Sequence, residues 1–321
     1  MPPPVIRGVL CAGNMVHDTV VWPVEGLAWN TTTWVEAIEQ HLGGNGASTS
    51  YTLGILGVPV RLLATTGRDA FGDLLLARLA RVGVDVSAVV RSEAPTPRTV
   101  ALVNAGGDRF FLHRPGASRE AFAQPLEFSP ALVGNLSHFH LANPFALPHV
   151  RRQAGEVLRR ARAAGLTTSV DTGWDQYGRW MEDLGPCLPF TDLLFPNEDE
   201  AKNLTGLNDL EAAAARLREL GAGAVIVKRG AEGCDGFTDE GSFHVPAFAV
   251  QPRDTTGAGD CFVGAFLAAL HRGRGWREAA RFANAVGALS VEKLGATPNL
   301  RSFEDTEAWM SQAGRPTYNQ E

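Results

Sequence analysis

The chain has 321 residues and a formal net charge of −6, with 45% hydrophobic and 20% charged residues. This composition excludes a largely disordered chain, because enough apolar side chains are present to bury a substantial core. The negative charge argues against a protein that binds nucleic acid by neutralising its phosphates.

Cysteine spacing and hydropathy predict a reduced protein without a membrane partner. The four cysteines are far apart and form no C-x-x-C pair, so a disulfide framework is not expected. The first residues lack a basic and apolar leader, and no run of about 20 apolar residues occurs. We therefore expect a cytoplasmic protein.

Short apolar runs alternate with amphipathic segments along most of the chain. The runs predict buried strands at 5–10, 60–64, 139–141, 168–171, 193–195 and 225–228. Helical spacing of apolar residues predicts helices at 49–56, 70–82, 150–164, 210–220 and 276–294. This alternation is typical of a mainly parallel sheet with helices on both faces, so we expect one three-layer α/β/α domain over residues 1–321.

Residues 16–39 and 98–112 interrupt this alternation, because they carry strand-like residues with no helix between them. Residues 104–108 have the composition of a hairpin turn. We expect a small antiparallel sheet that forms a lid at the carboxyl edge of the main sheet. Period-2 alternation would place large apolar side chains on both of its faces, which predicts a homodimer joined through the lid. These side chains are Trp22, Trp34, Val100, Leu102, Phe110 and Phe111.

A glycine-rich segment, Asp254-Thr255-Thr256-Gly257-Ala258-Gly259-Asp260, precedes a helical run near the C-terminus. Glycines before a helix let several backbone N–H groups converge on an anion at the positive end of the helix dipole. Asp260 would then accept the proton of a hydroxyl as phosphate bonds to it. The alternative is a plain loop whose aspartate stabilises a helix N-terminus. No lysine follows a glycine, so a P-loop is excluded.

A second glycine-rich turn, Gly43-Gly44-Asn45-Gly46-Ala47, lies near the N-terminus, where backbone amides and Asn45 could bind sugar hydroxyls. Together the two segments resemble the two signatures of the ribokinase-like (PfkB) carbohydrate kinases. The resemblance covers essentially the whole chain. It implies the ribokinase-like fold and ATP-dependent phosphorylation of a hydroxymethyl group of a small sugar.

The resemblance also implies roles for single residues. Asp260 would be the catalytic base, and Gly257, Ala258 and Gly259 would form the anion hole. The sugar-binding residues would be Asn14, Asp18, Gly43, Gly44, Asn45, Arg114 and Asp260. Asn14 and Asp18 could instead cap the turn into the lid, and Arg114 could lie at a solvated lid edge. We expect the helix dipole to keep Asp260 ionised without a raised pKa.

Nucleotide-site residues follow from the same resemblance. Asn197 and Glu200 resemble an N-x-x-E motif that positions magnesium through water, although, without the rest of the pattern, an acidic helix N-terminus would be the first interpretation. With these two, the nucleotide-binding residues would be Lys228, Gly230, Gly233 and Asn284. The implied cofactors are ATP and magnesium, with potassium held by Asp254.

The substrate class stays open between fructose-, ribose- and ketodeoxygluconate-like sugars. The strand before Asn143 lacks the acidic residue that ribokinase favours, whereas 171–174 with Arg179 and Trp180 resembles a pattern of fructokinase-like and ketodeoxygluconate-kinase-like members. A nucleoside kinase is one alternative, because tryptophans of the lid could stack on a nucleobase. A catalytically silent sugar- or nucleotide-binding protein is another, and the retained Asp260 argues against it.

Overall fold

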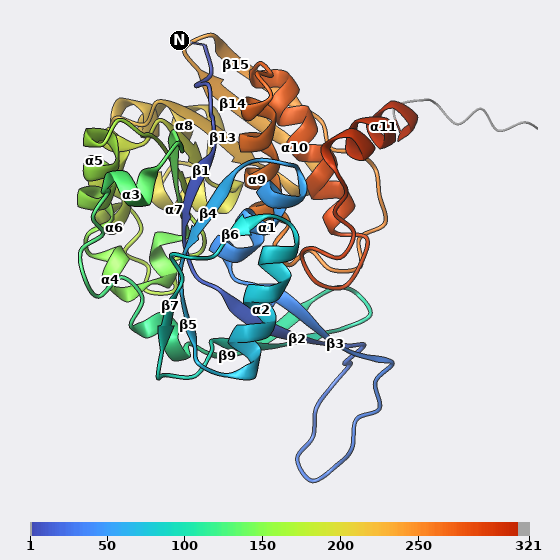
Figure 1. The fold of residues 1–321 in the computed structure, drawn as a ribbon. Helices are drawn as coiled ribbons and strands as arrows, with labels where there is room; N and C mark the ends of the chain where they lie inside the picture. The colour runs from blue at the N-terminus through green and yellow to red at the C-terminus, as the bar shows by residue number, and fades with distance from the viewer. Residues whose placement is uncertain (1, 314–321) are drawn as a thin grey trace, which may run out of the picture.

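A nine-stranded sheet forms the centre of the computed structural model, which describes residues 2–313 (Figure 1). The strand order is β15-β14-β13-β12-β11-β10-β1-β4-β6, parallel except for the β14–β15 hairpin at one edge. The strands are β1 Val9–Ala12, β4 Val60–Leu63, β6 Val84–Asp85, β10 His138–Ala142, β11 Thr167–Asp171, β12 Leu193–Phe195, β13 Ala224–Lys228, β14 Cys234–Thr238 and β15 Gly241–Val245.

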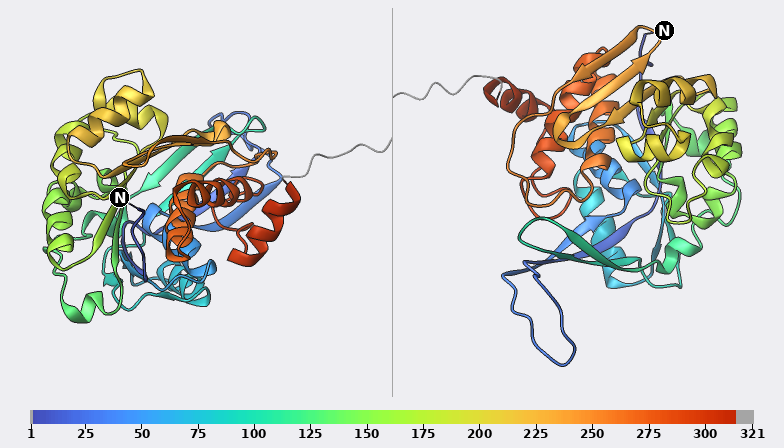
Figure 2. Two further views of the ribbon diagram at one scale, coloured as in Figure 1. Left: turned by 90° about the horizontal axis from the view of Figure 1, so that it is seen from above. Right: turned by 180° about the vertical axis from the view of Figure 1, so that it is seen from behind.

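Helices cover both faces of this sheet, which confirms the three-layer α/β/α fold (Figures 1 and 2). One face carries α1 Asn45–Ile55, α2 Ala70–Arg81, α9 Ala258–His271, α10 Trp276–Ser290 and α11 Phe303–Ala313. The other carries α3 Pro130–Val133, α4 Pro148–Arg151, α5 Ala154–Ala163, α6 Met181–Leu184, α7 Glu198–Thr205 and α8 Leu210–Glu219. Val9 and Cys11 of β1 enter the first core, and Leu10 and Ala12 enter the second. A strand buried on both faces needs such a continuous apolar run.

The small sheet has the order β3-β2-β8-β9 and lies beyond the carboxyl edge of the main sheet, at the bottom of Figure 1. We call it the lid. Its strands are β2 Val16–Trp22, β3 Ala37–Gly43, β8 Arg98–Val103 and β9 Arg109–Arg114. The expectation of a purely antiparallel sheet was wrong, since β2 and β8 pair in parallel. Each begins an antiparallel hairpin, and the two hairpins join through these first strands, which leave the body in the same direction.

Several element boundaries differ from the predicted ones. β1 begins at Val9 because Val5 is 76% exposed, outside the sheet. Trp34, predicted as a strand residue, lies in an irregular loop between β2 and β3 and is 90% exposed. The helix predicted at 150–164 is divided into α4 and α5. A further short pair, β5 Thr65–Gly67 and β7 Val90–Ser92, flanks α2. No helix within residues 2–313 is long and apolar enough to cross a bilayer.

Candidate active site

The two glycine-rich segments, far apart in the sequence, meet at the carboxyl edge of the main sheet. The Asn45 side-chain amide in the first turn of α1 donates a hydrogen bond to Asp260 Oδ1 in the first turn of α9, at 2.8 Å. Asn14 Oδ1 accepts the Asn45 backbone N–H at 2.8 Å. A Cβ on Gly13 would lie 2.6 Å from Gly46 Cα. Only glycine at 13 and 46 therefore allows the end of β1 to approach α1 this closely.

Asn143 extends this hydrogen-bonded chain. Its side-chain amide donates to Asn45 Oδ1 at 3.1 Å, so Asn143, Asn45 and Asp260 are linked in series. Asn143 adopts a left-handed conformation with φ of 50° directly after β10. Asn143 was not predicted as a site residue, and its only signal in the sequence was that of a polar residue at the carboxyl end of a parallel strand.

The turn before α9 has the form expected of an anion site. Gly257 adopts φ of +71°, and a Cβ there would lie 2.4 Å from Ala296 Cβ. Backbone N–H groups in the first turn of a helix lack acceptors four residues earlier. Buried Asp254 accepts Thr256 N–H at 2.9 Å and Gly295 N–H at 2.8 Å. It thereby ties the turn to the loop after α10.

Asp260 is buried, and its pKa is raised to about 7. Burial is the main cause and the negative charge of Asp171 adds to it, whereas the Asn45 hydrogen bond and the Lys228 charge lower the pKa. The expectation of an ordinary, unraised pKa was therefore wrong. The helix dipole falls off within one turn and is outweighed here by the loss of water.

Lys228 places a largely buried ammonium group beside the turn. It forms an ion pair with Asp171 at the end of β11, and a Cβ on Gly259 would lie 3.3 Å from its Nζ. Burial alone would lower the pKa of Lys228, but the charges of Asp171 and Glu200 outweigh it, so the pKa is raised. A positive charge is thereby held at the anion site.

Asn197 and Glu200 begin α7 next to this lysine. Asn197 Oδ1 accepts Glu200 N–H, and Glu200 Oε2 accepts Asn197 N–H, each at 2.8 Å. This is a capping box, as the helix-terminus alternative requires. Glu200 is also buried, which raises its pKa, and it accepts the Thr172 hydroxyl at 2.6 Å. An isolated bridge between Asn197 and Lys228 joins the cap to β13.

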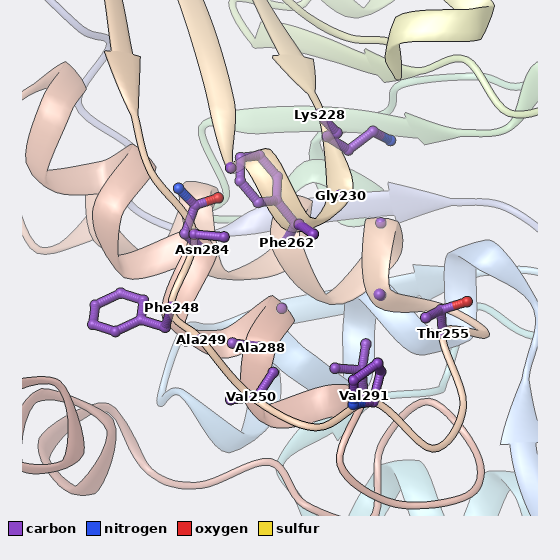
Figure 3. A pocket seen from close by; sticks show the side chains of 17 residues that line it. Lys228, Gly230, Phe248, Ala249, Val250, Thr255, Phe262, Asn284, Ala288 and Val291 are labelled. Carbon is purple, nitrogen blue, oxygen red and sulfur yellow. The ribbon is translucent and has the colours of Figure 1, made fainter. Parts of the chain in front are cut away.

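A cavity of about 480 Å³ opens between β13, α9 and α10 (Figure 3). The predicted residues Lys228, Gly230, Gly233 and Asn284 all line it. Asn284 donates from its side-chain amide to Val245 O at 2.9 Å. The remaining walls are mainly apolar and include Phe248, Val250, Phe262, Ala288 and Val291. Its size and lining suit a flat apolar group such as a nucleobase. Phe248 and Val250 could not be predicted as cavity residues, because the segment that carries them has no periodic pattern of apolar residues.

On the lid, Asp18 lies against the backbone of Gly43. A Cβ at Gly43 would come within 1.8 Å of Asp18 Oδ2, so a larger residue in β3 would have to displace the Asp18 carboxylate. Burial raises the pKa of Asp18 to about 7, partly offset by a hydrogen bond with Thr99, and the charge of Asp254 raises it further. Thr99 also contacts His113 Nδ1 at 3.1 Å. Asp18, Thr99 and His113 are register partners across three lid strands.

Residues 8–302 match the sequence model of the pfkB family of carbohydrate kinases. The chain belongs to this family. It is 30% identical over 281 residues to aminoimidazole riboside kinase of Salmonella typhimurium, covering 84% of this chain and 88% of that protein. It is 29% identical over 278 residues to fructokinase-1 of Zea mays, covering 80% and 84%.

The fold of this PfkB kinase also matches solved structures of its family. The E. coli protein described as ribokinase II, in complex with ATP and Mg²⁺, superposes with a TM-score of 0.83 at 25% identity. That alignment covers 95% of this chain and 99% of the E. coli chain. The small lid sheet and the large sheet thus belong to one established architecture.

Two features that the sequence predicted for the substrate site, Arg114 and most of the 171–180 pattern, lie away from the hydrogen-bonded series of Asn143, Asn45 and Asp260, which we call the asparagine–aspartate chain. Arg114 donates to Thr96 O at 3.2 Å, and its register partner Arg98 lies over the Phe71 ring of α2 at 4.0 Å. Partners on adjacent strands share a face, so Arg114 faces α2, opposite to the face that carries Asp18.

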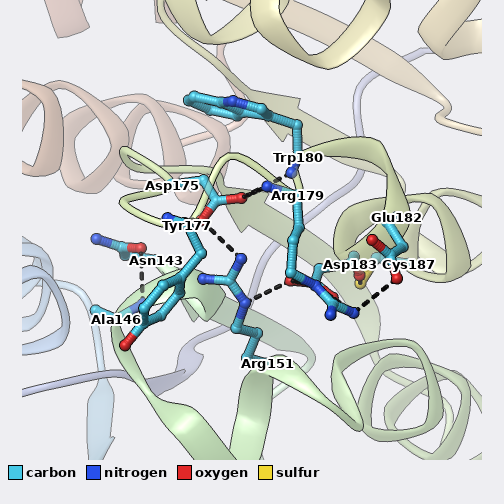
Figure 4. Close-up of polar contacts among 10 residues, drawn as sticks. All are labelled: Asn143, Ala146, Arg151, Asp175, Tyr177, Arg179, Trp180, Glu182, Asp183 and Cys187. Carbon is cyan, nitrogen blue, oxygen red and sulfur yellow. Dashed lines mark hydrogen bonds and ion pairs between the residues drawn. The ribbon is translucent and has the colours of Figure 1, made fainter.

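Asp175 and Arg179 of the 171–180 pattern contact neighbouring residues rather than the asparagine–aspartate chain (Figure 4). Arg179 forms ion pairs with Glu182 and Asp183. Buried Arg151 pairs with Asp175 at 2.6 Å and also with Asp183. Of this pattern, Asp171 pairs with Lys228 and Thr172 donates to Glu200, next to the anion turn, whereas Arg179 lies elsewhere.

Proposed function

We propose that this PfkB kinase transfers the γ-phosphoryl group of ATP to a hydroxymethyl group of a small sugar, with Asp260 as the base. The observation that carries the proposal is the Asp260 carboxylate, held by Asn45 within a turn of the Gly257–Gly259 segment and near Lys228. The sugar hydroxyl gives its proton to Asp260 while its oxygen bonds to phosphorus and the bond to ADP breaks. A pKa near neutrality suits a base that works near pH 7.

The anion turn and Lys228 act on the charge that moves during this transfer. Backbone N–H groups of Gly257, Ala258 and Gly259, at the positive end of α9, would stabilise the transferring phosphoryl group. Of these, the Ala258 N–H donates to Thr255 O at 3.3 Å and would have to exchange that acceptor for phosphate. The Lys228 ammonium adds a full positive charge in a buried setting, where electrostatic interactions are strong. The adenine would occupy the 480 Å³ cavity lined by Asn284.

The residues near the anion turn allow a divalent cation only through bridging water, because no group of three or more acidic, histidine or cysteine side chains within residues 2–313 could hold the ion directly. Asp171, Glu200 and Asp260 supply three buried carboxyl groups against the single ammonium of Lys228. Magnesium prefers oxygen ligands and keeps several waters, so Glu200 and Asn197 would hold it through water. When bound, it would neutralise phosphate charge.

Potassium would lie beside Asp254. Each Asp254 oxygen accepts one backbone N–H, from Thr256 and from Gly295, and carboxylate oxygens retain further lone pairs for a cation. The carboxylate already joins the two loops that would surround the ion.

The sugar site would be lined by the asparagines around Asp260 and by the lid. Asn14, Asn45 and Asp18 offer donors and acceptors for hydroxyls, with Gly43 and Gly44 making room for the ring. Arg114 is left out of this site because it faces α2. The fructokinase relative favours a fructose-like substrate. A nucleoside is the second candidate, because Phe111 of β9 is 47% exposed and the Salmonella relative is a riboside kinase.

A single assay tests these candidates. ATP consumption is measured with fructose, ribose, ketodeoxygluconate and a set of nucleosides, and the Asp260→Asn variant serves as control. Turnover with one sugar class that the variant lacks supports the proposal. Nucleoside turnover alone selects the second candidate, and ATP binding without any turnover selects a silent binding protein.

We also propose a homodimer through the outer face of the lid. Register places Ile38, Val21, Leu102 and Phe110 in one row across the four strands. Ile38 is 66% and Phe110 62% exposed. Such a contiguous apolar face on a thin sheet favours burial against a second copy. The long loop that follows β2 extends away from the body (Figure 1).

A further inference from the structure

Arg109 connects the lid to the phosphate turn. It begins β9, and its Nη1 donates to Thr256 Oγ1 at 3.2 Å. Its register partner Val103 is fully buried against Leu294 of the body, so Arg109 lies on the inner face of the lid. In Figures 1 and 2 the β8–β9 hairpin extends under the loops that flank α9.

The Arg109 guanidinium has donors to spare. Within residues 2–313 no carboxylate forms an ion pair with it, and Thr256 is its one hydrogen-bond acceptor there. A guanidinium carries five N–H donors in a planar fork that matches phosphate oxygens. By contrast, Arg229 near the nucleotide cavity is neutralised by Glu198, Glu232 and Asp235.

Position and charge together indicate a ligand for this group. Thr256 directly precedes Gly257, the first residue of the anion turn. We propose that Arg109 binds the terminal phosphate of ATP from the lid side, with Thr256 orienting its guanidinium. The proposal rests on the ATP site proposed above. The lid would then have a second role besides covering the sugar. Its strand β9, which pairs with the strand that carries Thr99, would also provide a side chain that binds phosphate.

The test compares nucleotides that differ in the terminal phosphate. Isothermal titration with Mg²⁺ measures binding of ADP and of the β,γ-imido analogue of ATP to wild type, Arg109→Gln and Arg109→Lys. Affinity for the analogue should fall about tenfold or more in Arg109→Gln, as expected for a lost charge-assisted hydrogen bond. ADP affinity should stay within about twofold, and Arg109→Lys should retain part of the analogue affinity.

Two controls separate this role from a structural one. Arg119→Gln removes an exposed arginine that has no ion pair within the described residues, and it should change neither affinity. Thr256→Val removes the acceptor and should weaken only analogue binding, by less than Arg109→Gln.

Other outcomes overturn the proposal. Equal losses for both nucleotides in Arg109→Gln would make Arg109 a structural contact of the turn. Unchanged binding of both would show that Arg109 touches no phosphate. Failure of wild type to bind ADP would instead reject the proposed ATP site itself.

Discussion

Replacing Asp260 by asparagine should change activity and stability in opposite directions. The amide retains an oxygen that can accept the Asn45 hydrogen bond, which is 2.8 Å long in the wild type, but it cannot take up a proton from the sugar. Loss of a positioned base should lower kcat on the order of 10²–10⁴-fold. Nucleotide affinity should change little, since the anion turn and Lys228 remain.

The free energy of unfolding should be higher in Asp260→Asn than in wild type, because burying the ionised Asp260 carboxylate destabilises the wild-type fold. Burial raises the pKa of Asp260 from 3.8 to about 7. At 1.36 kcal/mol for each tenfold change in proton affinity, this rise in pKa means that the ionised form destabilises the folded state by about 4 kcal/mol. The unfolded chain releases this proton near pH 4 and the folded chain near pH 7. The cost is therefore absent below about pH 4, grows between the two values and is complete above pH 7.

Thermal melts at about pH 4 and about pH 8 measure this difference. The variant should match wild type at the lower pH and unfold several degrees higher at the upper one. Asp69→Asn is the matched control. Burial alone would raise the pKa of Asp69, but hydrogen bonds from Thr96 and Gly72 outweigh it and lower the pKa. Its replacement should therefore lose stability above pH 4. An Asp260→Asn variant that keeps its turnover, or that melts below wild type at about pH 8, would refute the reasoning.

Three further substitutions and one change of salt test the proposed sugar site, the potassium site and the lid interface. Asn45→Ala removes a donor that lowers the pKa of Asp260, so the acid limb of the pH–rate profile should move up by roughly one pH unit; an unmoved limb contradicts that contact. Asp18→Ala should weaken sugar binding by about 1–3 kcal/mol with little change in kcat, and an unchanged KM for the sugar places the substrate elsewhere. If Asp254 helps to hold potassium, turnover should be faster in potassium than in tetramethylammonium, and equal rates remove that site. Phe110→Asp should turn the dimer into a monomer in light scattering, and a wild-type monomer would reject the lid interface.

The main sheet could be predicted because its signals are local. Runs such as Val225–Val227 are apolar throughout, as a strand buried on both faces requires. The lid was harder, since whether β2 and β8 pair in parallel depends on the direction in which two distant segments leave the body. Trp34 has strand propensity, but it lies on a loop with no partner strand, and pairing decides whether propensity is realised.

Within the candidate site, the glycine turns were visible in the sequence and their mutual placement was not. Asn143 could be recognised only through its hydrogen bond to Asn45, a contact between the residue after β10 and the first turn of α1. The pKa of Asp260 likewise depends on burial and on Asp171, neither of which has a local signature. Residue types can indicate which groups do chemistry, whereas their protonation states depend on tertiary packing.

The two carboxyl groups with pKa values of about 7 lie on different parts of the site, Asp260 on the body and Asp18 on the lid. Both shifts arise first from burial, and in each a hydrogen bond opposes burial, with Asn45 in one and Thr99 in the other. A sugar hydroxyl that donates to either carboxylate would add another such bond and favour the ionised form. By linkage, binding of the sugar near neutral pH would then release protons. With a pKa of about 7, Asp260 would be only partly ionised near neutral pH before the sugar binds. Binding of the sugar hydroxyl would therefore increase the fraction of Asp260 in the ionised form that acts as the base.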